Sequence, residues 1–142
     1  MSAKLTETLA LVGGVVPQSS TTAKNSDIVD FRHAQQVMFV LAVGSTDATV
    51  DFKLQAGNAA NLSDAADISG KAITQLAATD DNKYAIIHLT RNEMVGLGKR
   101  YGRAVVTCGA SGGTVAVIAL ADGLRYGDAP SFDLAAVAQV VG

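Results

Sequence analysis

The sequence predicts an all-β protein, an antiparallel β-sandwich or jelly roll with extended terminal arms. Three features indicate this fold class. Residues 50–55 alternate strictly between apolar and polar side chains, as in a strand with one face on a core and one in water. Several apolar runs of strand length are separated by short turns rich in Gly, Ser, Asp and Asn. Aromatic residues make up only 5% of a chain that is 49% hydrophobic, so Val, Leu, Ile and Ala must build most of the core.

The first segment, residues 1–26, is expected to be an N-terminal strand or arm followed by a polar loop. Residues 9–16 (LALVGGVV) are apolar and are interpreted as a first strand or a docking arm. Glu7 interrupts the approach to this run and no small-x-small cleavage site closes it, so a signal peptide is not expected. Residues 17–25 (PQSSTTAKN) are rich in Ser and Thr and are predicted to be a loop or linker.

Residues 27–130 are predicted to form the β-sandwich domain. A short strand is expected over 27–32. Two longer strands, 36–43 and 49–56, flank a polar Gly-Ser-Thr-Asp turn, and we expect them to pair as a hairpin. A connection rich in Asn, Ala, Ser and Asp, residues 58–67, follows this predicted hairpin.

The second half of the domain has clearer strand patterns. Residues 68–76 remain open between a short helix and a strand with a bend. Residues 83–90 (KYAIIHLT) are predicted to be a strand, and its last residue, a Thr, lies three positions before Glu93, which is the spacing of a helix capping box. A second hairpin is expected from strands at 101–108 and 114–121, joined by a glycine-rich loop.

The last segment, residues 131–142, is expected to be a C-terminal apolar arm. Its run FDLAAVAQVV (132–141) is compatible with a short helix or an added strand, and its apolar side chains must be buried somewhere. A single domain is expected overall, because 142 residues suffice for a core without metal or disulfide. No run of eighteen apolar residues occurs, so the sequence predicts no contact with a membrane.

No set of residues forms a convincing catalytic or metal-binding pattern. His33 and His88 are far apart and have no Cys or carboxylate at metal-ligand spacing. The serines occur in turn-like surroundings without a nucleophile elbow. Cys108, the single cysteine, is expected to be a small core residue. The sequence therefore predicts a protein that is not an enzyme and that binds no metal or cofactor.

The charge balance argues against a nucleic-acid partner. Eleven Lys and Arg stand against thirteen Asp and Glu, which gives a formal net charge of −2 and no overall basic field. The local exception is the run KRYGR. We expect its three cations, Lys99, Arg100 and Arg103, to contact an acidic protein surface.

The order of these segments resembles a known class of viral protein. The runs DFRHAQQVMFVLAVGSTDATVDFKLQAG, KYAIIHLT and YGRAVVTCGASGGTVAVIALADGLRYGDAP look like the small β proteins of tailed-bacteriophage heads, the decoration or cement class. The resemblance covers about residues 27–130 and consists of layout: a Gly-x-x-Asp turn before an alternating strand, and an aromatic-Gly-Arg strand before a glycine-rich turn. It implies a jelly-roll protein of the virion, made in the bacterial cytoplasm, that sits on the outer surface of the capsid, often as a homotrimer.

The resemblance also implies the partner, because proteins of this class clamp neighbouring copies of the major capsid protein and so stabilise the shell. The apolar ends suit such a role, since they are able to add a strand to a neighbour or fill its groove. The predicted contact residues are Leu9, Leu11, Val15, Val16, Leu134, Val137, Val140 and Val141, together with Lys99, Arg100 and Arg103.

Two other functions remain open on the sequence alone. A phage tail, tube or head-completion protein would share the β-rich composition and the lack of catalytic residues. A carbohydrate-binding jelly roll would need an exposed aromatic platform or a calcium site, for which three Tyr, four Phe and no Trp give little support.

Overall fold

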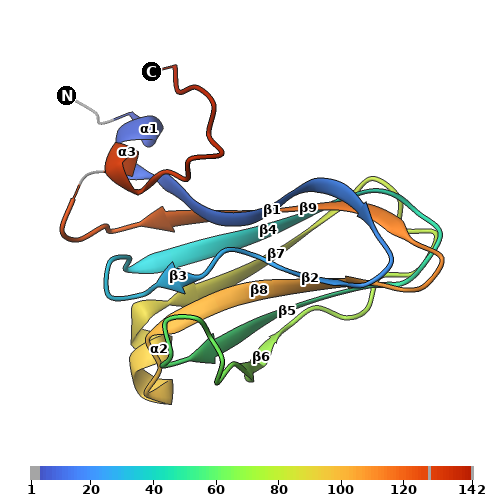
Figure 1. The fold of residues 1–142 in the computed structure, drawn as a ribbon, viewed down its shortest axis with the longest axis horizontal. Helices are drawn as coiled ribbons and strands as arrows, with labels where there is room; N and C mark the ends of the chain where they lie inside the picture. Colours follow the sequence, from blue (N-terminus) through green and yellow to red (C-terminus); the bar gives the residue numbers. More distant parts are fainter. Residues whose placement is uncertain (1–3, 128, 142) are drawn as a thin grey trace.

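A computed structural model of the protein describes residues 4–127 and 129–141 and shows a two-layer antiparallel β-sandwich (Figure 1). Sheet A contains, in spatial order, β1 (Ala10–Ser20), β9 (Gly113–Asp122), β4 (Gln36–Thr46) and β7 (Lys83–Thr90). Sheet B contains β2 (Ala23–Asn25), β8 (Tyr101–Cys108), β5 (Val50–Gly57) and β6 (Ala66–Ala72), and β3 (Val29–Asp30) also pairs with β8. Three short helices complete the described chain: α1 (Leu5–Thr8), α2 (Arg91–Leu97) and α3 (Ala129–Phe132).

The strands pair in a nested order. The first strand, β1, pairs with the last, β9, and β2 pairs with β8. Further inward along the chain, β4 pairs with β7 and β5 with β6. Additional pairing of β4 with β9 and of β5 with β8 joins these pairs into the two sheets. This order is that of a jelly roll, so the predicted fold class is confirmed.

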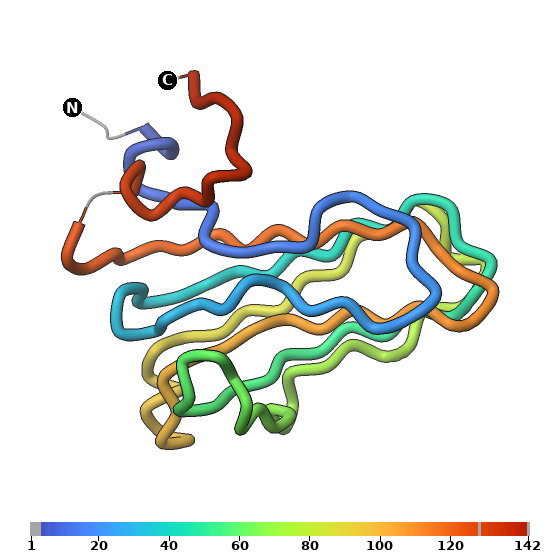
Figure 2. Tube along the Cα trace, in the orientation of Figure 1, coloured from blue at the N-terminus to red at the C-terminus, as the bar shows by residue number. Residues whose placement is uncertain are grey.

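Both predicted hairpins are wrong, although their strands exist. β4 lies in sheet A and β5 in sheet B, and β8 and β9 are likewise divided between the sheets. Each connection is therefore an arch over the end of the sandwich, which the tube in Figure 2 follows from one layer to the other. The two arches touch each other, since the Asp47 amide donates to the Gly112 carbonyl at 3.0 Å. A short polar turn is compatible with a hairpin within one sheet and with an arch between two sheets. The alternation of apolar and polar residues specifies which face of a strand is buried, but it does not specify which strand lies beside it.

The prediction of a loop over residues 17–25 is also wrong. The segment completes β1 and then forms β2, so its backbone is hydrogen-bonded in both sheets. Pro17 is accommodated because β1 is an edge strand and its register with β9 shifts between Val15 and Gln18. Bulges on edge strands are where a residue without an amide hydrogen fits a sheet.

The other local predictions have mixed outcomes. The strand at 83–90 and the capping box of α2 are confirmed; the Thr90 hydroxyl accepts from the Glu93 amide at 3.1 Å. The open segment at 68–76 contains most of a strand, β6, and the short strand expected at 27–32 is reduced to β3. Only the first residue of the run 132–141 is helical, as the end of α3, and its remaining residues form neither helix nor strand.

The core lies between the sheets and is built from the inward residues of both layers. Phe39 and Leu41 of β4 face Phe52 and Leu54 of β5 across the sandwich, and all four are at most 1% exposed. Cys108 is 2% exposed in the same core, as predicted, and its burial raises the pKa of the thiol. Burial of apolar surface between the sheets is therefore the main stabilising contribution to this fold.

Candidate interaction surfaces

The outer face of sheet A carries a grid of nine residues that contains no Lys, Arg, Asp or Glu. Three neighbouring strands supply three rows in register, which are Leu120–Met38–His88, Ile118–Val40–Ile86 and Ala116–Ala42–Tyr84. We call these nine residues the apolar face. Its exposed members include Ile86 at 59%, Ile118 at 42% and Met38 at 38%. Contiguous exposed apolar surface of this kind is typical of a site that binds another macromolecule.

The outer face of sheet B has the opposite character. The outward side chains of β5 are charged or amide groups that hydrogen-bond to polar neighbours, while β8 adds Thr107 and the 6% exposed Val105 to this face. Lys53 and Gln55 both donate to Asp67, at 2.9 and 3.0 Å, and Arg103 donates twice to Gln55. Gln75 likewise donates to Asp51 at 3.0 Å. The two layers therefore divide the surface into an apolar side and a hydrated side.

The two ends of the chain lie together beside β1 (Figure 1). The Leu11 amide donates to the Asp133 carboxylate at 2.7 Å, and the Leu134 amide donates to the Leu11 carbonyl at 2.9 Å. Their apolar side chains enclose a hollow of about 290 Å³, which is lined by Leu5, Thr6, Leu9, Leu11, Leu120, Asp133, Val137 and Val140. The apolar ends that the sequence singles out are thus brought into contact with each other within one chain.

This terminal cluster is continuous with the apolar face. Leu9 and Leu120 line the terminal hollow and also a second hollow of about 410 Å³, whose other walls include Met38 and Ile86. Val141, the last residue that the structure describes, is 79% exposed. Sheet A and the chain ends therefore offer one extended apolar surface.

The predicted contact residues fall into different environments. Leu9, Leu11, Val137 and Val140 belong to the terminal hollow, and the Leu134 backbone closes it. Val16 is 63% exposed in the β1 bulge, whereas its neighbour Val15 is 6% exposed and faces the core. Of the three cations, Lys99 and Arg100 lie beside α2, while Arg103 lies on the outer face of sheet B with Gln55. The apolar face itself was not predicted, although the alternation of β4 and β7 contains the signal.

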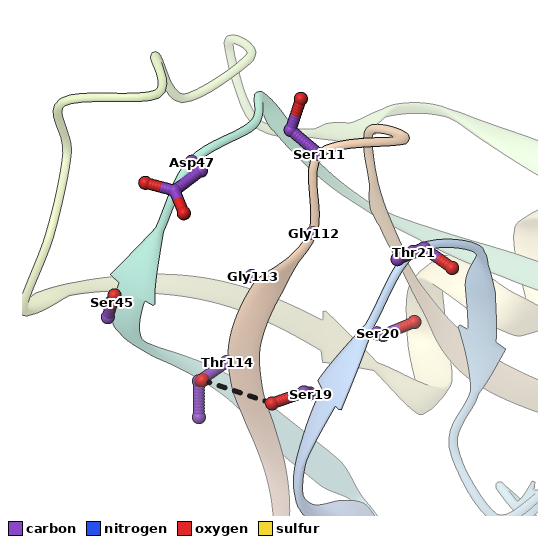
Figure 3. Close-up of a pocket in the computed structure, with 9 residues that line it drawn as sticks. All are labelled: Ser19, Ser20, Thr21, Ser45, Asp47, Ser111, Gly112, Gly113 and Thr114. Carbon is purple, nitrogen blue, oxygen red and sulfur yellow. Dashed lines mark hydrogen bonds between the residues drawn. The ribbon is translucent and has the colours of Figure 1, made fainter.

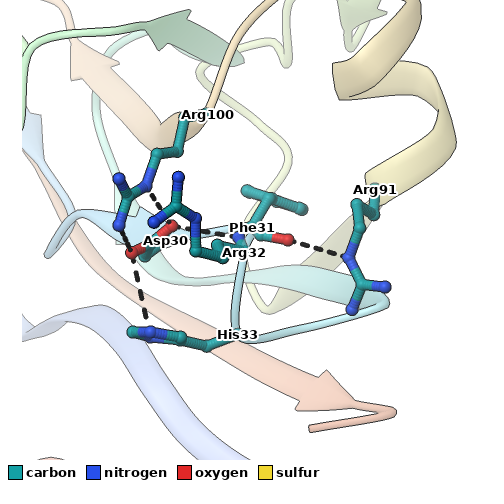
Figure 4. A network of polar contacts seen from close by, with 6 residues as sticks. All are labelled: Asp30, Phe31, Arg32, His33, Arg91 and Arg100. Carbon is teal, nitrogen blue, oxygen red and sulfur yellow. Dashed lines mark hydrogen bonds and ion pairs between the residues drawn. The ribbon is translucent and has the colours of Figure 1, made fainter. Parts of the chain in front are cut away.

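A network of charged groups surrounds Asp30 at one end of the sandwich (Figure 4). Arg100 donates two hydrogen bonds to the Asp30 carboxylate, from Nε at 3.0 Å and from Nη2 at 2.8 Å. The Arg32 amide donates to the same carboxylate at 3.0 Å, and Nδ1 of His33 lies 3.8 Å from it. Burial by itself raises the Asp30 pKa, but the hydrogen bonds and the charges of Arg100 and His33 outweigh it and hold the pKa below its ordinary value.

Asp30→Asn should lower the free energy of unfolding at pH 7. Because the folded-state pKa is depressed, the carboxylate stabilises the fold above its unfolded pKa of about 3.8 and loses this effect as the pH falls through the folded value. Urea unfolding at pH 7, 5, 4 and 3 should therefore show a difference between wild type and variant that shrinks below about pH 4. Asp47→Asn, at an exposed arch residue, is the control. A difference in the free energy of unfolding between wild type and Asp30→Asn that persists unchanged at pH 3 would show that the charge of the Asp30 carboxylate does not cause it.

A hollow rich in hydroxyl groups lies at the opposite end, among the arches (Figure 3). It has a volume of about 430 Å³ and is lined by Ser19, Ser20, Thr21, Ser45, Asp47, Ser111, Gly112, Gly113 and Thr114. Ser19 and Thr114 approach each other to 3.5 Å across β1 and β9. No aromatic ring lines this hollow, so it lacks the platform on which a sugar ring stacks.

Within residues 4–127 and 129–141, the two histidines and the remaining acidic groups form no common site. His33 packs against Tyr126 and Phe132, whereas His88 lies on the apolar face and contacts Gln36 at 3.1 Å. Across the part of the chain that the structure describes, no three His, Cys, Asp or Glu side chains are grouped to hold a metal ion. None of the helices in residues 4–127 and 129–141 has both the length and the apolar character needed to cross a membrane.

No protein-family model matches the chain, and no curated protein matches it in sequence. Solved structures do match. The PBSX exported protein XepA gives a TM-score of 0.55 at 13% identity over 90% of this chain and 41% of that chain, so the chain spans less than half of XepA. The Triatoma virus empty capsid gives a TM-score of 0.50 at 8% identity over 87% and 94% of the respective chains. The SPBc2 prophage-derived protein YomS gives a TM-score of 0.45 at 8% identity over 85% of this chain and 97% of that chain. At these identities the first two matches show a shared fold, a jelly roll that also occurs in a viral capsid.

Proposed function

We propose that this chain is a structural protein of a tailed-bacteriophage virion, which decorates the outer surface of the capsid and stabilises it by binding neighbouring copies of the major capsid protein. The contact runs through the apolar face of sheet A, and the polar outer face of sheet B remains in solvent. The observation that carries the proposal is this contrast between the two outer faces, because a sandwich that functioned alone would expose polar side chains on both sheets.

Three further observations support the proposal. The sequence resembles the decoration class over most of its length. The fold is shared with a viral capsid protein at a TM-score of 0.50. The terminal cluster extends the apolar surface beyond the sheet, and we propose that a single copy uses this extension to touch more than one neighbour. Many modest contacts of this kind, repeated over a shell, act together and hold more strongly than each does alone.

The first test is the copy number of the chain in virions. Particles are sedimented from the lysate of cells in which the virus that encodes this chain multiplies, and the chain is quantified against the major capsid protein by mass spectrometry. A number of copies comparable to that of the shell protein is the expected result. A few copies per particle would overturn the proposal in favour of a tail or connector protein, and complete absence from particles would overturn any virion role.

The second test is a charge placed on the apolar face. Ile118→Lys alters an outward residue of the central strand β9 that is 42% exposed, so folding should persist while burial of the new charge in an interface should be costly. Thr107→Lys, which adds the same charge on the outer face of sheet B opposite Asp51, is the matched control.

Each protein is added to particles that lack it, and its occupancy is measured after sedimentation. Ile118→Lys should reduce occupancy at least about tenfold, which corresponds to a loss of 1.4 kcal/mol in binding, and Thr107→Lys should leave it unchanged. Equal occupancy of the two variants would remove the apolar face from the proposal. The oligomeric state, expected to be a trimer from the resemblance, is read from the sedimentation velocity of the free protein.

A further inference from the structure

A cleft lined by basic side chains lies at the end of the sandwich where α2 meets the β3–β4 connection and the segment after β9. Its volume is about 250 Å³. Five of the eleven Lys and Arg of the chain line it, from several separate segments: Arg32, Arg91, Lys99, Arg100 and Arg125. We call this site the basic cleft. The chain as a whole has a net charge of −2, so the concentration of positive charge is local.

The hydrogen-bonding capacity of these cations is only partly used. Arg100 is committed to the Asp30 carboxylate through Nε and Nη2. Arg91 donates from Nε to the Phe31 carbonyl at 2.9 Å, a bond visible in Figure 4. The Arg91 Nη2 is buried and has no acceptor within residues 4–127 and 129–141. An unpaired charged donor in such a position is costly, and an anion nearby would lower that cost.

Two other cations of the cleft also lack acceptors among the described residues. The side chains of Arg32 and Lys99 make no hydrogen bond or ion pair with the described part of the chain. Lys99 does interact electrostatically with Asp64, but the amides of Asn58 and Ala59 already occupy the carboxylate oxygens of that residue. Asp30 and Asp64 therefore offset part of the positive charge of the cleft, whereas Arg32 and Arg91 have no carboxylate partner among these contacts.

The cations are held in place before any ligand arrives. The hydrogen bond to the Phe31 carbonyl orients the Arg91 guanidinium. The Arg100 guanidinium is oriented by its two hydrogen bonds to Asp30 and lies 4.8 Å from the centre of the Tyr101 ring. The Lys99 amide is tied to the Met94 carbonyl at 2.9 Å, which fixes the backbone from which the lysine projects. Such preorganisation reduces the entropy lost on binding an anion.

Apolar side chains complete the lining. Phe31 and Met94 are buried at 1% and 0% exposure, and Val95 is 69% exposed. A carboxylate on a short aliphatic stem matches this combination, because guanidinium groups pair with carboxylates while the methylenes contact the exposed Val95. We propose that the basic cleft binds a glutamate-bearing acidic segment of a partner protein.

The same observations disfavour nucleic acid as the ligand. Nucleic-acid sites combine a basic stripe along the backbone with aromatic rings on which bases stack. The ring that lines the basic cleft belongs to Phe31, which is 1% exposed and offers no face on which a base can stack. A volume of about 250 Å³ accommodates one side chain and not a base with its sugar and phosphate.

The test is a titration of the isolated protein with a short capped peptide that contains two Glu around one Leu, followed by NMR and calorimetry. The expected result is saturable binding that shifts the Arg91 and Lys99 signals, weakens as NaCl is raised, and is absent for the peptide with Gln in place of Glu. Arg32→Gln/Lys99→Gln should weaken it about tenfold, the effect of losing one charge-assisted hydrogen bond. Lys24→Gln/Lys83→Gln changes the net charge equally outside the cleft and should bind like wild type.

Several results would overturn the inference. These are no binding of the Glu peptide, equal weakening by the control double variant, inorganic phosphate binding as tightly as the peptide, or a single-stranded oligonucleotide binding where the peptide does not. The titration needs neither particles nor the apolar face. A negative result would therefore leave the proposed capsid function intact, and a chain absent from virions would leave the cleft intact.

Discussion

Phe39→Ala should lower the free energy of unfolding by about 3–5 kcal/mol, the range typical of emptying a buried phenylalanine site. Phe39 is fully buried on β4, and β4 is the strand that pairs with both β7 and β9. Its partners across the two ladders are Ile87 and Ala119, which cannot fill the space because both sheets are closely packed. A loss of this size is a large part of the total stability of a domain.

The neighbouring residue provides the control. Met38 lies next to Phe39 on the same strand but points to the apolar face, where it is 38% exposed. Met38→Ala should therefore cost much less in urea unfolding of the isolated protein, and it should reduce occupancy on particles instead. Similar losses of stability in the two variants would contradict the inward and outward assignment of β4.

Gly14→Ala should destabilise the protein by about 1–3 kcal/mol, the range found when a packed site is overfilled. Gly14 lies opposite Ile118 in the β1–β9 ladder, and a Cβ built on it would lie against the Val117 carbonyl oxygen, closer than real Cβ atoms approach. The obstructing atom belongs to the backbone of a paired strand, so β1 must move away from β9.

Gly44→Ala is the matched substitution. A Cβ at Gly44 of β4 would meet Thr114 at ordinary contact distances of 3.6 to 3.7 Å, so little change in stability is expected. Hydrogen exchange of the β1 amides distinguishes the two variants, because only Gly14→Ala should speed their exchange. Unchanged protection of β1 in Gly14→Ala would show that the strand tolerates the added methyl group.

Local sequence patterns predicted the strands better than their neighbours. The alternation of residues 50–55 identified the buried side of β5 correctly, and the capping-box spacing located the start of α2. The same patterns suggested hairpins that do not exist, because an arch between sheets and a turn within a sheet use the same small and polar residues. The loop predicted from Pro17 onward was wrong for a related reason. A bulge on an edge strand can accept proline, and the composition of the segment does not distinguish such a bulge from a loop.

The interaction surfaces were predicted only where their residues are adjacent in sequence. Lys99 and Arg100 were found because they follow each other, whereas Arg32 and Arg125 join them only through the fold. The apolar face is assembled from β9, β4 and β7, whose order in space differs from their order in the chain. A sequence of alternating strands contains such a face implicitly, but the strand order that places its rows side by side becomes visible only in three dimensions.

The nested pairing of the strands also affects how the protein is made. Ala10 of β1 pairs with Ala121 of β9, so β1 leaves the ribosome long before the strand with which it pairs. Until then its apolar residues and open edge are exposed to other nascent chains. Folds dominated by such distant pairings acquire their native structure in milliseconds to seconds, more slowly than helical proteins of similar size. The strand order that brings the two terminal segments of the described chain together is thus the same order that delays the pairing of β1 during synthesis.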